Sequence, residues 1–258
     1  DLFQDKNRPM VIPKCLGDGY VKIILPPTKQ LRAYTKELSK RAKVIRAGCD
    51  PSVDNMLKVT GDLRKSTLML TGDGGRLLKV DKVVETAWRV WNGTHRNKGA
   101  QAIFCDMGVP KPKKDKVIEP EIVDEENVEE DFFETAQEAK MVENIYEQIQ
   151  KGLVMSGVPA DQIAYIHSAK TKTEKTALFA RVNSGEIRII IGSTEKLGVG
   201  VNIQKRLVAS YHLSFPWRPS DLIQRDGRIE RQGNGWESIV KFVCIIQASG
   251  DGFLWQTL

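Results

Sequence analysis

Cysteine is scarce in this sequence and follows no metal-binding pattern. The four cysteines lie far apart and none forms a Cys-x-x-Cys pair, so the spacing of a zinc ribbon is absent. Cys105 and Cys244 stand inside apolar runs and are predicted to be buried thiols. Unpaired, scattered cysteines favour a reducing compartment, and we expect a cytoplasmic location.

Long apolar runs are also missing. No stretch approaches the roughly 20 apolar residues of a membrane span, so we expect no membrane partner, and we expect no secretory leader at the start. The first residue is Asp1 rather than Met, which favours a piece of a longer protein. The sequence shows neither clustered carboxylates on a strand–helix frame nor a cofactor-binding glycine loop at a strand end, so a free-standing nuclease or methylase has no support.

Charge is the one compositional feature that points to a partner. The net charge is +6 and the isoelectric point is about 9.0, which is a mild hint of a polyanionic partner. With 258 residues, the chain can bury a real core as one large domain or two small ones.

The first part of the chain, residues 1–98, is predicted to be a helical segment. After a short extended piece and a Pro-Pro break, a helix is predicted over 28–47, with Thr28 as its N-cap and Gly48 as its stop. Its apolar residues recur at helical spacing. Two further helices are predicted over 50–70 and 79–92.

From residue 99 to residue 258 the pattern changes to strands that alternate with helices. Short apolar runs typical of buried parallel strands occupy 102–105, 163–167, 187–193, 206–214 and 238–246. Helical stretches over 134–155 and 173–182 separate most of these runs. The alternation predicts an α/β fold, a parallel sheet with helices on both faces.

A charged stretch at about residues 111–134 interrupts this alternation. It is basic at Lys113, Lys114 and Lys116, and strongly acidic from Glu119 to Glu134. Such segregated charge is typical of a solvated loop.

Three predicted strand ends carry polar residues, and ligands of open parallel sheets bind at such ends. After the strand over 187–193 come Ser193, Thr194, Lys196, Gly198, Gly200 and Asn202. The two glycines allow close approach of the backbone to a ligand, and a simple tight turn is an equally good interpretation. After the strand over 163–167 come His167, Ser168 and Lys170, which could hold a backbone phosphate. His167 alone is better explained as a core residue.

The third strand end leads into an arginine-rich helix. Pro219 or Ser220 begins it, and Gly233-Asn234 is its predicted stop. One face carries Gln224, Arg228 and Arg231. The planar guanidinium suits phosphate because it donates two parallel hydrogen bonds and stays charged. The alternative is a surface helix whose arginines pair with Asp226 and Glu230.

Taken in order, these segments resemble the second RecA-like lobe of superfamily-2 helicases and translocases. The pattern Gln-x-x-Gly-Arg-x-x-Arg-x-Gly over 224–233 is similar to the sixth motif of that family, and Gly-x-Gly-x-Asn over 198–202 to its fifth. Gln30, early in the first helix, and Leu63-Arg64-Lys65 resemble the Swi/Snf-type translocases. The stretch 193–234 also resembles the helicase part of large phage- or plasmid-borne proteins that join a helicase to a DNA methyltransferase.

The resemblance implies roles for individual residues. ATP sits between two lobes in this family, and the second lobe supplies arginine fingers, which correspond to Arg228 and Arg231. Arg225 is expected to be structural or to face DNA. The nucleotide cleft would be lined by Gly198, Gly200, Asn202 and Gln224. The DNA backbone would lie along His167, Ser168, Lys170, Ser193, Thr194 and Lys196.

The first lobe of such a motor has no counterpart in the sequence. No Gly-x-x-x-x-Gly-Lys-Ser/Thr loop occurs, and no Asp-Glu magnesium motif in a matching context. The resemblance therefore implies ATP with Mg²⁺ whose ligands come from a first lobe, and no ATP hydrolysis by this chain alone. Many relatives have an acidic residue near this position that can bind ribose. This chain has Gly200 there instead, so the resemblance implies no ribose contact. The alternative function is a non-catalytic DNA-docking or protein-interaction module derived from a helicase lobe.

Overall fold

The computed structural model describes residues 12–17, 19–108, 144–197 and 202–258. Its centre is a seven-stranded sheet in the order β1-β7-β6-β3-β5-β4, with β2 also paired to β7. Every strand pair in the described residues is parallel. The strands are β1 Lys14–Cys15, β2 Val21–Leu25, β3 Ala100–Phe104, β4 Ile163–Tyr165, β5 Ile189–Gly192, β6 Leu207–His212 and β7 Ser238–Ile246.

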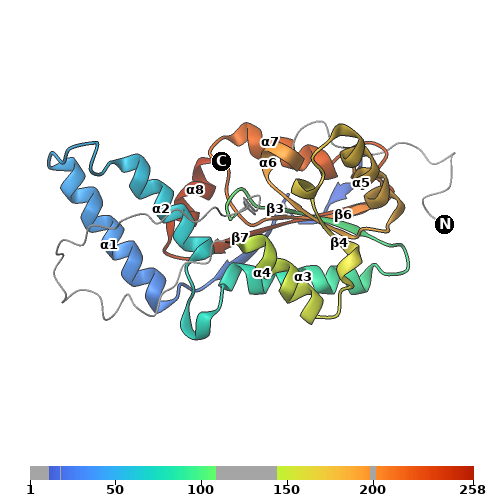
Figure 1. Cartoon of the computed structure of the whole chain (residues 1–258), viewed down its shortest axis with the longest axis horizontal. Helices are drawn as coiled ribbons and strands as arrows, with labels where there is room; N and C mark the ends of the chain where they lie inside the picture. The colour runs from blue at the N-terminus through green and yellow to red at the C-terminus, as the bar shows by residue number, and fades with distance from the viewer. Residues whose placement is uncertain (1–11, 18, 109–143, 198–201) are drawn as a thin grey trace, which may run out of the picture.

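Helices cover both faces of this sheet, which confirms the predicted α/β architecture. The helices are α1 Lys29–Arg46, α2 Met56–Met69, α3 Leu78–Gly93, α4 Ile145–Met155, α5 Lys172–Ser184, α6 Thr194–Leu197, α7 Pro219–Ile229 and α8 Gly250–Thr257. In Figure 1, α3 and α4 lie below the strands, and α5, α6 and α7 lie above them.

The core explains why the strands are continuous apolar runs. Ile189 and Ile191 pack into the cluster beneath α3 and α4, whereas Ile190 packs into the cluster beneath α5 and α7. Alternate side chains of a strand point to opposite faces, so a sheet covered on both sides needs apolar residues at every position.

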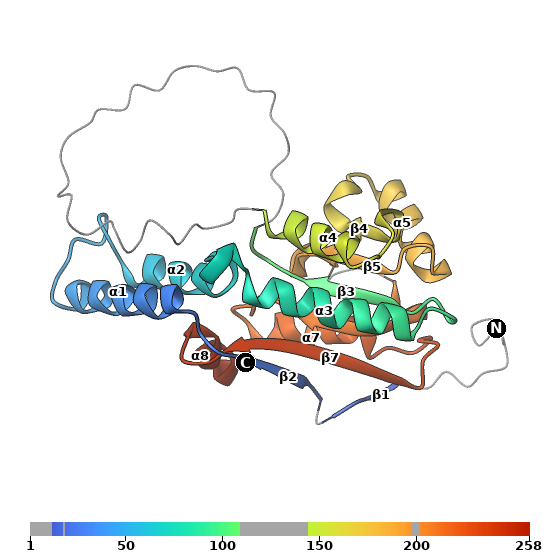
Figure 2. The ribbon, with the colours of Figure 1, turned by 90° about the horizontal axis from the view of Figure 1, so that it is seen from below.

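The helix predicted near the start is confirmed, and its ends have local causes. The Thr28 hydroxyl accepts a hydrogen bond from the Leu31 N–H at 3.0 Å, as an N-cap does. Gly48 has φ of +114°, a conformation that favours glycine. With α2, this helix forms a hairpin that projects from one end of the sheet (Figures 1 and 2). Arg41 ties the two together through Asp54 and Asp62, each at 2.9 Å.

The N-terminal segment supplies more than helices. Residues 21–25 run beside β7 in register from Phe242 to Ile246, and Lys14–Cys15 extends the same edge. The described part of residues 1–98 thus contributes two strands to the sheet in addition to three helices. The charged stretch at 111–134 lies outside the described residues.

Several boundaries differ from the prediction, and the helix predicted over 50–70 begins only at Met56. The strand expected over 163–167 ends at Tyr165, and a 3-10 turn over Ile166–Ser168 follows. The arginine helix ends at Ile229 rather than at Gly233. In the described part of the chain, no helix is both long and apolar enough to cross a membrane.

Candidate functional site

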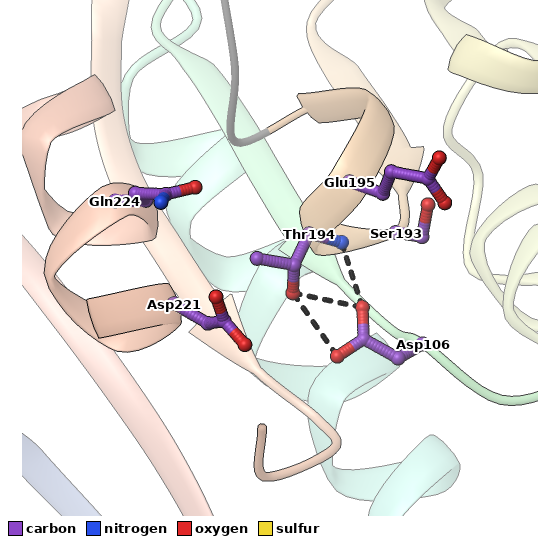
Figure 3. Close-up of a pocket in the computed structure, with 6 residues that line it drawn as sticks. All are labelled: Asp106, Ser193, Thr194, Glu195, Asp221 and Gln224. Carbon is purple, nitrogen blue, oxygen red and sulfur yellow. Dashed lines mark hydrogen bonds between the residues drawn. The ribbon is translucent and has the colours of Figure 1, made fainter. Parts of the chain in front are cut away.

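A cavity of about 400 Å³ opens at the carboxyl ends of β3 and β5 (Figure 3). Its lining residues are Asp106, Ser193, Thr194, Glu195, Asp221 and Gln224. Asp221 and Gln224 extend from α7 toward the turn that joins β5 to α6. Two predicted nucleic-acid residues, Ser193 and Thr194, therefore share a cavity with Gln224, a predicted nucleotide residue.

The glycine at the end of β5 allows the two neighbouring segments to pack close to the strand end. A Cβ atom on Gly192 would overlap the side chains of Leu197 and Ile166. Without it, α6 and the turn that carries His167 pack directly against the strand. The two predicted phosphate-binding loops are thereby brought together.

Beneath the cavity, a buried arginine joins three strand ends. Arg225 is fully buried, and its Nη2 lies 2.6 Å from an Asp106 carboxylate oxygen. Its other nitrogens donate to the Thr194 hydroxyl at 2.8 Å and to the Ser214 carbonyl at 2.7 Å. Burial lowers the pKa of Arg225, and the Asp106 carboxylate opposes that effect. Arg225 is thus structural, one of the two roles expected for it.

Thr194 also takes part in these buried contacts. Its N–H donates to Asp106 at 2.6 Å, and its hydroxyl also contacts that carboxylate (Figure 3). The side chain is buried, and its hydroxyl is hydrogen-bonded within the fold, to Asp106 and Arg225. We therefore leave Thr194 out of the nucleic-acid interface proposed below.

The arginine helix starts as predicted and ends through a side chain. Pro219 occupies its first turn, where the missing N–H costs nothing. At the other end, the Asn234 amide donates to the Ile229 carbonyl at 3.1 Å and to the Leu207 carbonyl at 2.8 Å. Asn234 thus satisfies the helix end from five residues downstream, and Arg231 lies beyond the helix.

One of the two predicted finger arginines, Arg231, contacts Asn202. Arg231 Nη1 donates to the Asn202 side-chain oxygen at 2.8 Å. Burial and, after it, the charge of Arg231 lower the pKa of Arg228. The segment after α7 and the end of the glycine-rich turn therefore meet. Gly198 and Gly200 of that turn lie outside the described residues.

A buried lysine anchors α7 to the sheet. Lys241 of β7 is 5% exposed, and its Nζ lies 2.8 Å from Asp226 and 2.6 Å from Glu230. Burial alone would lower the pKa of Lys241, but the two carboxylates raise it. The Tyr20 hydroxyl also donates to Asp226. The surface-helix alternative pairs both carboxylates with arginines. In the structure they have a buried partner on β7 instead.

The burial of His212 predicts a folding stability that depends on pH. His212 is 1% exposed, stacks on Phe104 and lies 3.3 Å from Asp226. Burial and the charges of Arg225 and Lys241 lower its pKa, although Asp226 opposes them. The unfolded chain then binds a proton near pH 6.5 that the folded chain does not, so stability falls as pH drops below about 6.5.

Urea unfolding at pH 7.5 and pH 5.5 checks this expectation. The slope contributed by one such histidine is at most about 1.4 kcal/mol per pH unit. The variant His212→Phe keeps a ring in place and should show a weaker dependence on pH. His167, whose pKa is also lowered by burial and Lys196, leaves a residual slope of the same sign. An unchanged dependence in His212→Phe would contradict the assignment.

The loop after β4 is only partly available to a ligand. His167 is half-buried and meets the Tyr146 ring edge-on, with centroids 5.3 Å apart. Ser168 is exposed, and its hydroxyl donates to the Tyr165 carbonyl at 2.6 Å. Lys170 and Lys196 are exposed.

Sequence reasoning missed most of the acidic residues of this region. Asp106, Glu195 and Asp221 line the cavity, and Lys241 anchors the helix. The one available signal was Asp106, which directly follows a buried apolar run. In the described residues, no group of three or more His, Cys, Asp or Glu side chains is arranged to hold a metal ion.

Comparison with known proteins finds a family model that matches part of the chain. Residues 113–233 match the model described as helicase conserved C-terminal domain. No curated protein matches the sequence.

Solved structures with similar folds extend beyond that segment. The C-terminal part of the Fun30 ATPase domain matches with a TM-score of 0.56 at 11% identity, over 95% of this chain and 89% of that chain. The Sulfolobus solfataricus SWI2/SNF2 ATPase core matches with a TM-score of 0.54 at 12% identity, over 93% of this chain. The match spans only 42% of the Sulfolobus chain.

The helicase conserved C-terminal domain thus matches residues 113–233 of the chain. The fold is similar to those of the Fun30 and SWI2/SNF2 ATPase structures.

Proposed function

We propose that this lobe is the second half of an ATP-dependent DNA helicase or translocase motor. In this proposal Arg228 and Arg231 are its arginine fingers, and Gly198, Gly200, Asn202 and Gln224 bind the nucleotide. The observation that supports this most directly is the 2.8 Å bond between Arg231 and Asn202. It joins the segment that carries the fingers to the end of the glycine-rich turn.

The electrostatics of the described residues fit a polyphosphate. Two guanidiniums lie close enough for the charge of one to lower the pKa of the other. An anion between them relieves that repulsion, and bidentate donors match phosphate geometry. When ATP is bound, the fingers neutralise charge that develops on the transferred phosphoryl group. The Mg²⁺ ligands come, in this proposal, from a first lobe.

The proposed nucleic-acid contacts are with the phosphate backbone of DNA. Ser168, Lys170 and Lys196 are exposed, and His167 and Ser193 are half-buried, in the segments that follow β4 and β5. Such contacts position a strand without reading its sequence, and they weaken with salt. ATP binding closes the two lobes and hydrolysis opens them, so strand contacts alternate in strength.

The setting of the lobe is part of the proposal. All four cysteines are free thiols, which is compatible with a reducing cytoplasm. A linked DNA methyltransferase domain stays a prediction from the sequence resemblance alone.

The proposed sharing of one ATPase site between two lobes can be tested directly. We expect purified residues 1–258 to hydrolyse no ATP, and the complete motor to hydrolyse ATP faster when duplex DNA is added. Phosphate release is measured for both, with and without DNA. Turnover by the chain alone that scales with its concentration and disappears in Arg231→Ala would refute the half-site proposal. A complete protein that binds DNA but never hydrolyses ATP would instead have a docking function.

A further inference from the structure

The outward face of α1 carries a row of cations, here called the α1 stripe. It comprises Lys29, Arg32, Lys36, Lys40, Lys43 and Arg46, and all six are exposed. At 100° per residue, these positions fall within about 120° of the helix circumference. The row runs the whole length of the helix, about 26 Å at 1.5 Å per residue.

The other side of α1 serves the fold. Leu31 and Leu38 are buried, and Arg41 pairs with Asp54 and Asp62. Arg41 is thus a basic residue of α1 whose charge is satisfied within the hairpin. The helix contains seven basic residues and a single acidic one, Glu37, whose carboxylate lies 3.5 Å from Lys40. Its outward charge is therefore nearly uniform in sign.

The stripe does not stabilise the helix that carries it. Cations spaced three and four residues apart repel each other and destabilise a helix by a few tenths of a kcal/mol per pair. Lys29 and Arg32 stand in the first turn, where cations oppose the helix dipole, whereas Lys43 and Arg46 stand in the last turn, where cations favour it. The helix dipole therefore gives no net reason for the row, and the repulsion between its members remains.

We propose that the α1 stripe binds the phosphate backbone of double-stranded DNA, at a place separate from the ATP cleft. A straight row of about 26 Å matches a rigid partner, since that length of duplex presents roughly eight phosphates per strand. The hairpin projects from the end of the lobe toward which β7 points, as Figure 2 shows. The candidate site lies at the same end, at the carboxyl ends of the strands. The proposal rests on the proposed function only in taking the polyanion to be DNA.

The test removes three charges of the stripe and leaves the helix intact. Arg32→Gln, Lys36→Gln and Lys43→Gln are combined, because glutamine has nearly the helix propensity of lysine and arginine. Binding of residues 1–258 to a fluorescent duplex of about 30 base pairs is followed by anisotropy over a salt series. We expect affinity at low salt to fall at least about 10-fold and the log–log salt slope to decrease by roughly two to three. The melting temperature should stay the same or rise slightly, because repulsion is removed.

A matched triple variant controls for net charge. Arg89→Gln, Lys151→Gln and Arg181→Gln remove the same charge from exposed positions on α3, α4 and α5 that pair with carboxylates. Its affinity should stay within about twofold of wild type, since exposed pairs have small effects. A third variant, Lys170→Gln with Lys196→Gln, reports on the backbone contacts of the proposed function.

Each outcome decides the question. Loss of DNA affinity in the stripe variant but not in the matched control supports the proposal. Unchanged affinity and slope in the stripe variant, with a loss in the Lys170 and Lys196 variant, would overturn it and leave the proposed function standing. Equal losses in the stripe variant and the matched control would reduce the effect to net charge and also overturn it. Wild-type binding to polyglutamate as tight as to duplex DNA would assign the stripe to an acidic protein instead.

Discussion

Replacing Arg231 with alanine in the complete motor should lower kcat for ATP hydrolysis by on the order of 10³-fold or more. The guanidinium is held near Arg228 and bonded to Asn202 at 2.8 Å. A finger acts on charge that appears only in the transition state, so its loss lowers kcat more than it raises KM. Arg228→Ala should have a comparable effect. Steady-state phosphate release at saturating DNA measures both.

Two further variants make this result specific. Arg231→Lys keeps a positive charge but loses the planar fork, so it should recover only part of the activity. Arg89→Ala removes an exposed arginine on α3, paired with Glu85 at 2.6 Å, and should leave kcat unchanged. If kcat in Arg231→Ala stayed within a few-fold of wild type, the fingers would lie elsewhere.

The sequence predicts those elements whose signals are local. The helix over Lys29–Arg46 follows from a capping threonine and a terminal glycine, both of which act within one turn. The central strands follow from unbroken apolar runs, because both faces of the sheet are buried. In contrast, Val21–Leu25 is a short run whose partner, β7, lies near the other end of the chain. Its place in the sheet depends on tertiary pairing that no local pattern encodes.

The candidate site is likewise only partly predictable from the sequence. The family resemblance implies that Arg231 and Asn202, from two different motifs, serve one ligand, and their side chains are hydrogen-bonded in the structure. The resemblance does not predict how deeply each arginine is buried. Arg225 and Arg228 stand three residues apart in one helix, yet Arg225 is fully buried against Asp106 and Arg228 only in part. That difference depends on where β3 ends, which only the folded sheet determines.

The contacts of α7 fix the helix that leads into the segment of the proposed fingers. Arg225 fixes the helix to the ends of β3 and β6, and Asp226 and Glu230 fix it to Lys241 on β7. After Ile229 the path of the chain is fixed by the Asn234 side-chain amide, which donates to the Ile229 carbonyl. A ligand group supported by rigid neighbours needs little reorganisation when the transition state forms.

The buried contacts of Arg225 with Asp106, Thr194 and Ser214 should therefore contribute strongly to folding stability. Arg225→Met keeps an unbranched side chain of similar length but leaves the Asp106 carboxylate without its buried cation. Breaking a buried ion pair by removing one partner destabilises a protein by about 3–5 kcal/mol. The Thr194 hydroxyl and the Ser214 carbonyl also lose a donor. Urea unfolding should show this as a lower midpoint with an unchanged slope.

Removing the second charge should restore part of the loss. In the double variant Arg225→Met with Asp106→Asn, no unpaired carboxylate remains, and the asparagine oxygen still accepts from the Thr194 N–H. We expect it to be more stable than Arg225→Met alone by about 1–2 kcal/mol. The exposed pair of Arg89 and Glu85 is the control, and Arg89→Met should change stability by less than about 1 kcal/mol. A loss below that level in Arg225→Met would mean that water replaces the guanidinium at Asp106, and that the ends of β3 and β6 are joined by other contacts.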